Sequence, residues 1–223
     1  MRFIFSRVCF TLATVLAISA ASVRPAQADI IVTAGVNNQD TDNVLLNTVD
    51  DVALVTATVN SGLFDVFFDS SSATGLLDAD ASGQAVITPG AGNDPFTNVG
   101  FFIEAGSSFT RAVFNLNSGS DGDLLISVTG INILGGLFQE TVEVDANGQN
   151  FFTVDAISGQ RITAIDLTAL GDVEFEDLRQ VRIGGAGADI TPIPEPATML
   201  LFGSGLVGIA AARRRRASGT RKS

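Results

Sequence analysis

The charges of this 223-residue chain are sorted along its length, and the sorting divides it into a body and two ends. All 24 acidic residues lie between Asp29 and Glu195, and only four basic residues share that stretch, so its net charge is −20. A protein that binds nucleic acid needs a basic surface, so we expect no nucleic-acid partner. The first 28 and the last 27 residues carry basic residues and no acidic ones. These basic ends indicate orientation in a membrane.

The N-terminus has the parts of a secretory signal peptide. Arg2 and Arg7 form a positive start, residues 8–21 are an apolar run, and Ala26-Gln27-Ala28 places small residues at both positions that a signal peptidase inspects. An N-terminal core helix or a retained anchor is the alternative, but the run is shorter than the ~20 apolar residues that cross a bilayer. The sequence therefore predicts a signal peptide over 1–28, export, and cleavage by signal peptidase before Asp29.

The C-terminus is also built from three parts. Pro194-Glu195-Pro196 is followed by 16 uncharged residues (197–212), by four arginines and by a short tail (217–223). The prolines fix φ and lack amide donors, so the motif stays extended and accessible to a protease. A 16-residue helix spans ~24 Å against a ~30 Å hydrocarbon core, and snorkelling arginines absorb the mismatch. The positive-inside bias places the arginines in the cytoplasm; they are Arg213, Arg214, Arg215 and Arg216.

The uncharged stretch also contains a G-x-G-x-x-G pattern at Gly203, Gly205 and Gly208. In a dinucleotide-binding fold this pattern follows a strand and opens a helix. Only 15 residues follow Gly208, which leaves no room for the second strand and its acidic residue. A membrane helix, in which glycine is frequent, explains the pattern better.

The tail resembles a PEP-CTERM sorting domain. Pro194-Glu195-Pro196, the uncharged helix and the arginine cluster match that pattern over 192–216, within a sorting segment that we place at 190–216. Such domains occur on exported proteins of Gram-negative bacteria that carry an exosortase. The resemblance implies recognition by this membrane protease, a transient inner-membrane anchor, and then release or transfer to the cell surface. It also implies an association with extracellular polysaccharide or biofilm material, and it leaves the activity of the body open.

Between the two ends, residues 29–189 are predicted to form one all-β domain, a β-sandwich of jelly-roll type. Short apolar runs alternate with Gly, Asn, Asp and Ser, which is typical of strands and turns. A body of this length can bury a single core, and each of three Phe-Phe pairs is expected to place one ring inside and one outside. The expected strands are 30–34, 52–59, 64–69, 84–88, 99–104, 109–115, 124–129, 137–144, 150–154, 162–167 and 173–183.

Two of the four cations of the body, Arg179 and Arg182, fall in the last of these runs. In a regular strand, residues three apart face opposite sides. We expect the two arginines to pair with Glu174, Glu176 or Asp177 and to hold the strand in register, in preference to binding a ligand.

Several acidic turns offer oxygen ligands for calcium, at 37–42, 78–80, 93–94 and 121–123. Carboxylates two residues apart can share one ion. The best candidate is the Asp121-Gly122-Asp123 turn. The alternative is a solvated acidic surface whose Asp and Asn residues form turns. No other cofactor is expected.

The residue types that are absent limit the chemistry of the body. The chain has no His, and its only Cys, Cys9, lies in the signal peptide, so Ser-His-Asp, Cys-His and imidazole or thiolate metal sites are excluded. A non-enzymatic surface or extracellular-matrix protein is the leading hypothesis. A carbohydrate-binding module is the alternative, although the chain lacks the Trp and Tyr of usual sugar platforms. A glycoside hydrolase with two carboxylates ranks last.

Overall fold

The computed structural model describes residues 29–188, apart from 73–74, 82–84, 91–94 and 147–148. Every regular element in these ranges is a β-strand, which confirms the all-β prediction. The strands are β1 (Ile30–Ala34), β2 (Thr41–Leu46), β3 (Val49–Val52), β4 (Val55–Val59), β5 (Asp65–Asp69), β6 (Leu77–Asp80), β7 (Val86–Pro89), β8 (Asn98–Ile103), β9 (Ser107–Ser108), β10 (Arg111–Ser118), β11 (Gly122–Ile131), β12 (Leu137–Ala146), β13 (Gln149–Ala156), β14 (Arg161–Ala169), β15 (Phe175–Gly184) and β16 (Gly187–Ala188).

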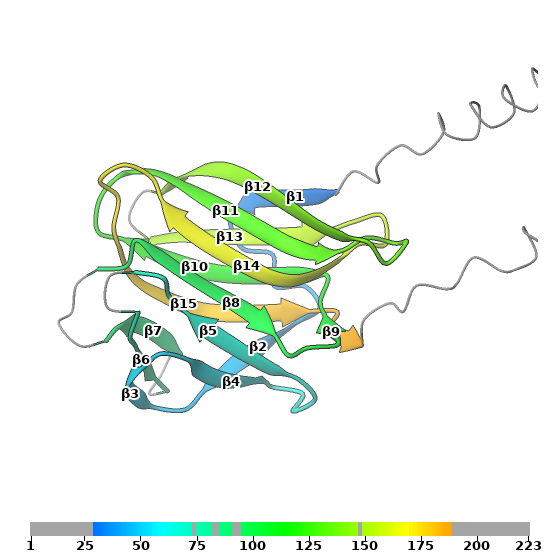
Figure 1. The fold of residues 1–223 in the computed structure, drawn as a ribbon, viewed down its shortest axis with the longest axis horizontal. Helices are drawn as coiled ribbons and strands as arrows, with labels where there is room; N and C mark the ends of the chain where they lie inside the picture. The colour runs from blue at the N-terminus through cyan, green and yellow to red at the C-terminus, as the bar shows by residue number, and fades with distance from the viewer. Residues whose placement is uncertain (1–28, 73–74, 82–84, 91–94, 147–148, 189–223) are drawn as a thin grey trace, which may run out of the picture.

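The strands pack as a two-layered sandwich (Figure 1). Layer A has the order β1-β13-β10-β15, with β7, β6 and β3 continuing beyond β15. Layer B has the order β4-β5-β8-β14-β11-β12. β2 joins the layers, because its first half pairs with β15 and its second half with β4. All of these pairings are antiparallel, and most of them join strands that are far apart in the sequence, such as β1 with β13 and β2 with β15.

A chain of phenylalanine rings crosses the interior from one layer to the other. The ring centroids of Phe68 and Phe101 in layer B lie 5.8 Å apart, and Phe101 meets Phe114 of layer A edge-on at 5.7 Å. Phe114 in turn lies 5.8 Å from Phe152. All four rings are buried. These rings supply much of the apolar area that holds the two layers together.

The prediction for the three Phe-Phe pairs is confirmed. Phe68, Phe101 and Phe152 are buried, whereas their chain neighbours face outward and are partly exposed. The alternation follows from the pleat of a strand, which sends successive side chains to opposite faces.

One acidic segment that we expected to be a turn is a strand, and another runs into one. The segment from Asp78 to Asp80 lies within β6, whereas residues 37–40 precede β2, which takes in only the last two residues of the expected turn at 37–42. In β6 the small apolar Ala79 points into the core between two outward acids, and the Asp78 carboxylate accepts a hydrogen bond from the Asp51 amide at 2.7 Å. Short strands of this kind carry too few apolar residues to show an alternating pattern.

β15 contains a bulge that overturns the prediction for its two arginines. Arg179 lies opposite Asn115 and Arg182 lies opposite Val113, so Gln180 and Val181 together oppose one residue of β10. Gln180 has a φ of 54°, a left-handed conformation that accommodates the extra residue. Because Asn115 and Val113 share a face of β10, Arg179 and Arg182 share the outer face of layer A. The expectation that they face opposite sides is therefore wrong.

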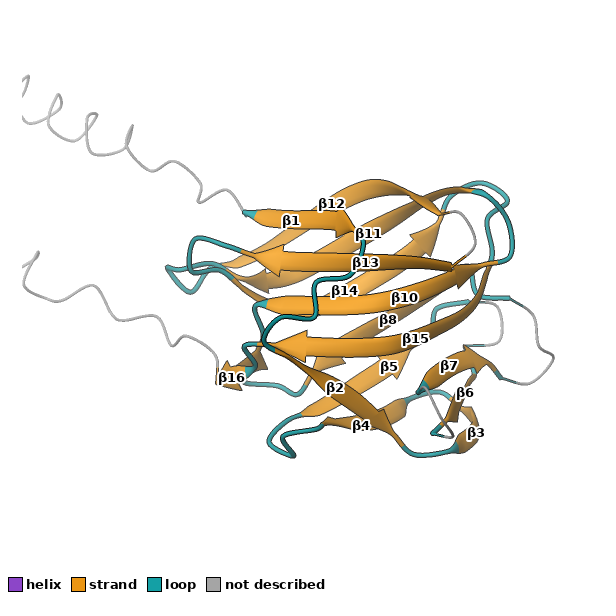
Figure 2. Ribbon diagram, turned by 180° about the vertical axis from the view of Figure 1, so that it is seen from behind, coloured by secondary structure: helices purple, strands orange, loops and turns teal. Residues whose placement is uncertain are grey.

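The connection from β1 to β2, residues 35–40, crosses the outer face of layer A as a strap (Figure 2). The Gly35 amide donates to the carbonyl of Phe151 at 2.7 Å, and the Asn37 amide donates to the Thr153 hydroxyl at 3.1 Å. The Arg111 guanidinium donates to the carbonyl of Gln39 at 3.0 Å. These bonds fix the strap over β13 and β10.

Phe67 and Phe68 provide a matched test of the layer assignment, because they are neighbours on β5 with opposite orientations. Phe68→Ala leaves a cavity between the layers and is expected to lower the free energy of unfolding by about 3–5 kcal/mol. Phe67→Ala removes a partly exposed ring and should cost about 1 kcal/mol. Chemical denaturation of the two variants measures both values. Equal losses would contradict the two-layer packing.

Candidate functional site

A groove of about 420 Å³ opens on the outer face of layer A, where β2 and β7 diverge from β15. β7 pairs with β15 at Leu178 and Arg179, while β2 pairs with it from Arg182 to Gly184. The bulge residues Gln180 and Val181 lie between these pairings and line the groove. A sheet that splits around a bulge therefore produces the concave surface.

Side chains from the strap, from three strands and from the connection between β6 and β7 line this groove. Val36 and Asn38 come from the strap, Asn43 from β2, Phe151 from β13, and Gln180 and Arg182 from β15. Apolar walls with a few converging polar groups are typical of a ligand-binding site.

Two buried polar atoms on this face lack partners among the protein atoms. They are Nε of Arg182, which lines the groove, and Oδ1 of Asn115. Asn115 is 3% exposed and lies opposite Phe151 in the ladder between β10 and β13. The first atom is a donor and the second is an acceptor. Because an unpaired buried polar atom destabilises the fold, both atoms favour a ligand or water that offers the complementary group.

The other arginines of layer A are already engaged. Nε of Arg111 lies 2.5 Å from a carboxylate oxygen of Asp155. Arg179 is paired with Asp177, as the sequence predicted, and its Nε donates to Asp177 at 2.5 Å. The hydrogen bond with the Asp177 carboxylate is the largest cause of the raised pKa of Arg179. Among the described residues of this face, Arg182 is the arginine without an ion pair.

The outer face of layer B carries a different arrangement, a pair of carboxylates on either side of a glycine. Asp69 of β5 and Asp166 of β14 both lie opposite Gly100 of β8. A Cβ at Gly100 would lie 2.5 Å from Oδ1 of Asp166 and 3.3 Å from Oδ1 of Asp69. Burial raises the pKa of Asp166, and the negative charge of Asp69 raises it further.

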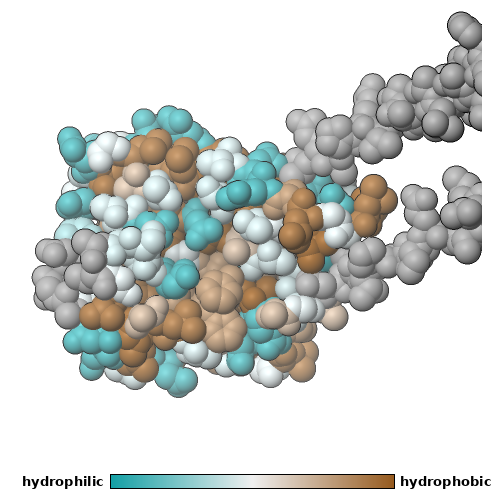
Figure 3. All heavy atoms as spheres, viewed as in Figure 1, coloured by the Kyte–Doolittle hydropathy of each residue, from teal (hydrophilic) through white to brown (hydrophobic). Residues whose placement is uncertain are grey.

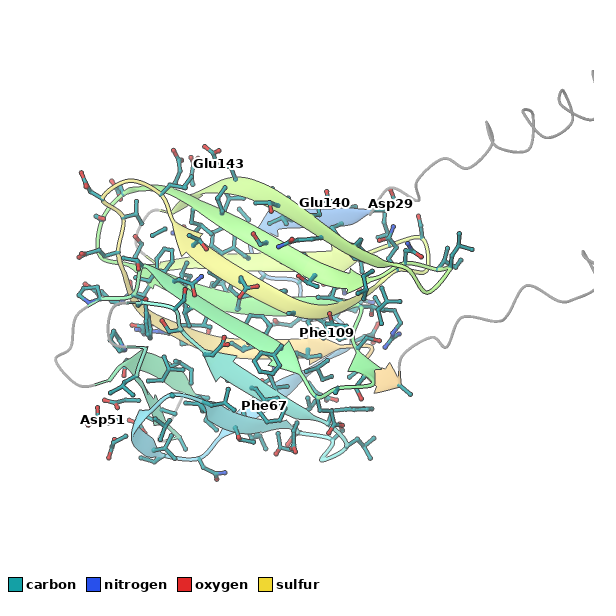
Figure 4. The ribbon with its side chains drawn as sticks, viewed as in Figure 1. Asp29, Asp51, Phe67, Phe109, Glu140 and Glu143 are labelled. Carbon is teal, nitrogen blue, oxygen red and sulfur yellow. The ribbon has the colours of Figure 1, made fainter. Side chains whose placement is uncertain are left out.

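Phe67 and Phe102 stack beside these carboxylates, with their centroids 5.3 Å apart and their planes at 26°. Figure 4 labels Phe67 on the side of layer B. Figure 3 shows that an apolar area lies among polar residues on this face. No sequence pattern indicates the carboxylate pair, because its members are 97 residues apart and only the strand order brings them together.

The residues predicted to direct export lie mostly outside the described ranges. These are Ala26, Ala28, Pro194, Glu195, Pro196 and Arg213 to Arg216. Asp29 is described, and its carbonyl accepts a hydrogen bond from the Ile157 amide at 3.0 Å. No helix within the described ranges could cross a bilayer, and the predicted anchor at 197–212 lies beyond them.

Asp121 and Asp123, the predicted calcium ligands, are exposed at the start of β11. In the part of the chain that the structure describes, no group of three carboxylates gathers around a common point. Calcium binding stays a prediction, and two exposed carboxylates are fewer than the six to eight oxygen ligands that the ion takes.

Comparison with known proteins identifies the tail. The PEP-CTERM protein-sorting motif matches residues 192–216, so the chain carries this sorting motif, as its sequence predicted. The motif indicates export, a transient membrane anchor and sorting to the cell surface. No curated protein matches the chain.

Among solved structures, the body is similar to carbohydrate-binding modules. A family 29 module is 14% identical over 70% of this chain and 86% of that chain, with a TM-score of 0.30. A family 11 module from Clostridium thermocellum, in complex with a β-1,3-1,4-mixed-linked tetrasaccharide, is 12% identical over 65% of this chain and 95% of that chain, with a TM-score of 0.29. At these TM-scores the likeness supports no statement about a ligand.

The raised pKa of Asp166 leads to a pH-dependent prediction. The folded chain holds this proton at pH values where an unfolded carboxyl, with an ordinary pKa of 3.8, has lost it. The contribution to stability is therefore complete below pH 3.8 and is lost as the pH rises through the folded-state pKa. At pH 7, Asp166→Asn should unfold at a higher temperature than wild type. The gain in the free energy of unfolding should be no more than about 1 kcal/mol, because water screens the half-buried group.

Thermal unfolding between pH 3 and pH 8 measures this effect, which should vanish at the acidic limit. Asp69→Asn is the matched control, because it removes the neighbouring charge. It should reduce the change of unfolding temperature with pH in the range where Asp166 loses its proton. A destabilising effect of Asp166→Asn that is the same at every pH would contradict the assignment.

Proposed function

We propose that this protein is an exported, non-enzymatic surface or extracellular-matrix protein that binds polysaccharide through the groove of layer A. The observation that carries the proposal is the donor Nε of Arg182, a groove residue, which has no partner among the protein atoms. A sugar hydroxyl accepts hydrogen bonds, so a polyhydroxylated chain suits this donor. The partly exposed ring of Phe151 adds an apolar surface for the C–H face of a sugar.

The charge of the body selects among polysaccharides. With a net charge of −20 over residues 29–195, it repels polyanions at long range. The single unpaired arginine of the groove is too little to reverse this field. A neutral polysaccharide is therefore the proposed ligand class, in preference to a uronic-acid polymer.

Catalysis is not part of the proposal. The two carboxylates that come together, Asp69 and Asp166, lie on the outer face of layer B, whereas the groove lies on the opposite layer. A hydrolase needs its carboxylates on either side of the bound glycosidic bond. The groove itself is lined by amides, an arginine and apolar groups.

Affinity electrophoresis of the full chain through neutral β-glucan, galactomannan and alginate tests the groove. We expect retardation by a neutral polymer. Arg182→Ala should weaken this binding about tenfold or more, because a hydrogen bond from a charged group contributes about 1.5–3 kcal/mol. Phe151→Ala should weaken it about two- to tenfold.

Phe67→Ala is the matched control for Phe151→Ala, since it removes a partly exposed phenylalanine from the outer face of the other layer. It should leave binding unchanged. Binding that depends on Phe67 and not on Arg182 or Phe151 would move the site to layer B. The absence of retardation by all three polymers would count against polysaccharide binding altogether.

For the tail, we propose that signal peptidase removes residues 1–28 and that an exosortase-type protease acts at Pro194-Glu195-Pro196 while the arginine cluster stays in the cytoplasm. Glu195 is the only charge of the motif, so it is the group that a cation of the protease would recognise. After processing, the released protein would attach to extracellular polysaccharide through the groove of layer A.

Glu195→Ala tests this step in a host that has the sorting protease. Wild type should lose its C-terminal segment and leave the inner membrane, while the variant accumulates there at full length. Asp189→Ala removes a neighbouring acid outside the motif and should be processed like wild type. If wild type and Glu195→Ala are processed alike, the motif is merely a linker.

A further inference from the structure

The end of the sandwich from which both termini leave carries an exposed apolar tip. The tip is the turn between β11 and β12 together with its flanks, and its side chains are Ile133, Leu134 and Leu137, which are 62%, 75% and 82% exposed. Leu134 and Leu137 are the two most exposed large apolar residues of the described chain. The turn projects beyond the rest of the sandwich in Figures 1 and 2, and apolar residues form the outermost point of this end in Figure 3.

The apolar tip is connected through neighbouring residues to the first and to the last described segments of the chain. Ile133 lies over the turn between β13 and β14, where a Cβ at Gly159 would be 3.1 Å from its Cδ1. The same turn begins at Ile157, whose amide donates to the carbonyl of Asp29. On the other side, Ile131 lies opposite Arg161, which donates to the carbonyl of Gly185 at 2.7 Å, two residues before β16.

The apolar tip lies within an uncharged stretch of the chain. The 16 residues from 124 to 139, which include the tip, carry no charge. At the opposite end of the same strands, hydrogen bonds and pairings bring acidic turns together, since Leu170 donates to the carbonyl of Asp123 and Gly119 donates to that of Glu174. Figure 4 shows Asp29 at the same end of the sandwich as the tip and Asp51 at the opposite end. The acids gathered at the far end are Asp121, Asp123, Asp145, Asp172 and Glu174.

We propose that the apolar tip docks on the lipid surface while the C-terminal segment anchors the chain. This inference rests on the proposed anchoring. The chain between Ala188 and the predicted membrane helix at 197 spans at most about 32 Å, so the end that bears the tip is held next to the bilayer. A convex, uncharged, apolar turn suits the interfacial region of a membrane, where binding grows with the apolar area buried.

The tether makes weak docking sufficient. Insertion of three side chains by a free protein would be concentration-limited, but a tethered tip meets the membrane at a high effective concentration. The acidic far end then points away from anionic lipid headgroups, which would repel it. Docking in this orientation would hold Ala188 and the following motif close to the membrane face, where a membrane-embedded protease acts.

Site-specific fluorescence tests the docking with the full chain in vesicles of phosphatidylethanolamine and phosphatidylglycerol. A nitrobenzoxadiazole label is placed at Leu134→Cys in a Cys9→Ser background. We expect a blue shift of its emission and quenching by lipids that carry a nitroxide on the acyl chain. The control label at Asp145→Cys lies on the same strand as Leu137, about 27 Å away, and should show neither change.

Ile133→Ser combined with Leu137→Ser should reduce the quenching at position 134, and both positions are exposed. Vesicle flotation separates the two proposals. A chain that floats with vesicles while the label at 134 stays in water overturns docking and leaves the anchor intact, whereas a chain that does not float overturns both. Equal quenching at 134 and 145, or shielding at 134 only when the sorting protease is present, also overturns docking to lipid.

Discussion

The left-handed backbone of Gln180 is the local constraint from which the grooved face of this sandwich follows. β15 is bordered by β10 along one edge, but its other edge is shared between β7 and β2. A regular strand would keep a single neighbouring strand along that edge. The bulge at Gln180 and Val181 shifts the register, and β2 turns away to join layer B. The result is a groove beside a strand that would otherwise be paired throughout.

The bulge also decides the electrostatics of this face. It places Arg182 on the same side as Arg179, but Asp177 neutralises only Arg179. The strap closes over the sheet and leaves Oδ1 of Asn115 buried without a partner. These unpartnered atoms lower the stability of the fold, and the proposed binding of a ligand in the groove would offset that cost at Arg182.

Much of this architecture was predictable from the sequence, and the exceptions have physical causes. The Phe-Phe pairs define inner and outer faces because strands alternate strictly, and the tail is defined by the order of its parts. The strand β2 was missed because its first half, Thr41 to Asn43, is polar and because the strand crosses between the layers, where alternation breaks down. The groove was missed because a bulge in a strand leaves no mark in composition. The carboxylate pair at Gly100 depends on strand order, which periodicity does not encode.

The most direct test of the account follows the backbone amides of the full chain by NMR during titration with a neutral β-glucan oligosaccharide. The account predicts that the shifts that change belong to the strap at 36–38, to β2, to Phe151 and to residues 180–182, and that those of Phe67, Phe102 and Asp166 stay fixed. Changes confined to layer B, or changes spread evenly over both faces, would contradict the assignment of the groove as the binding site.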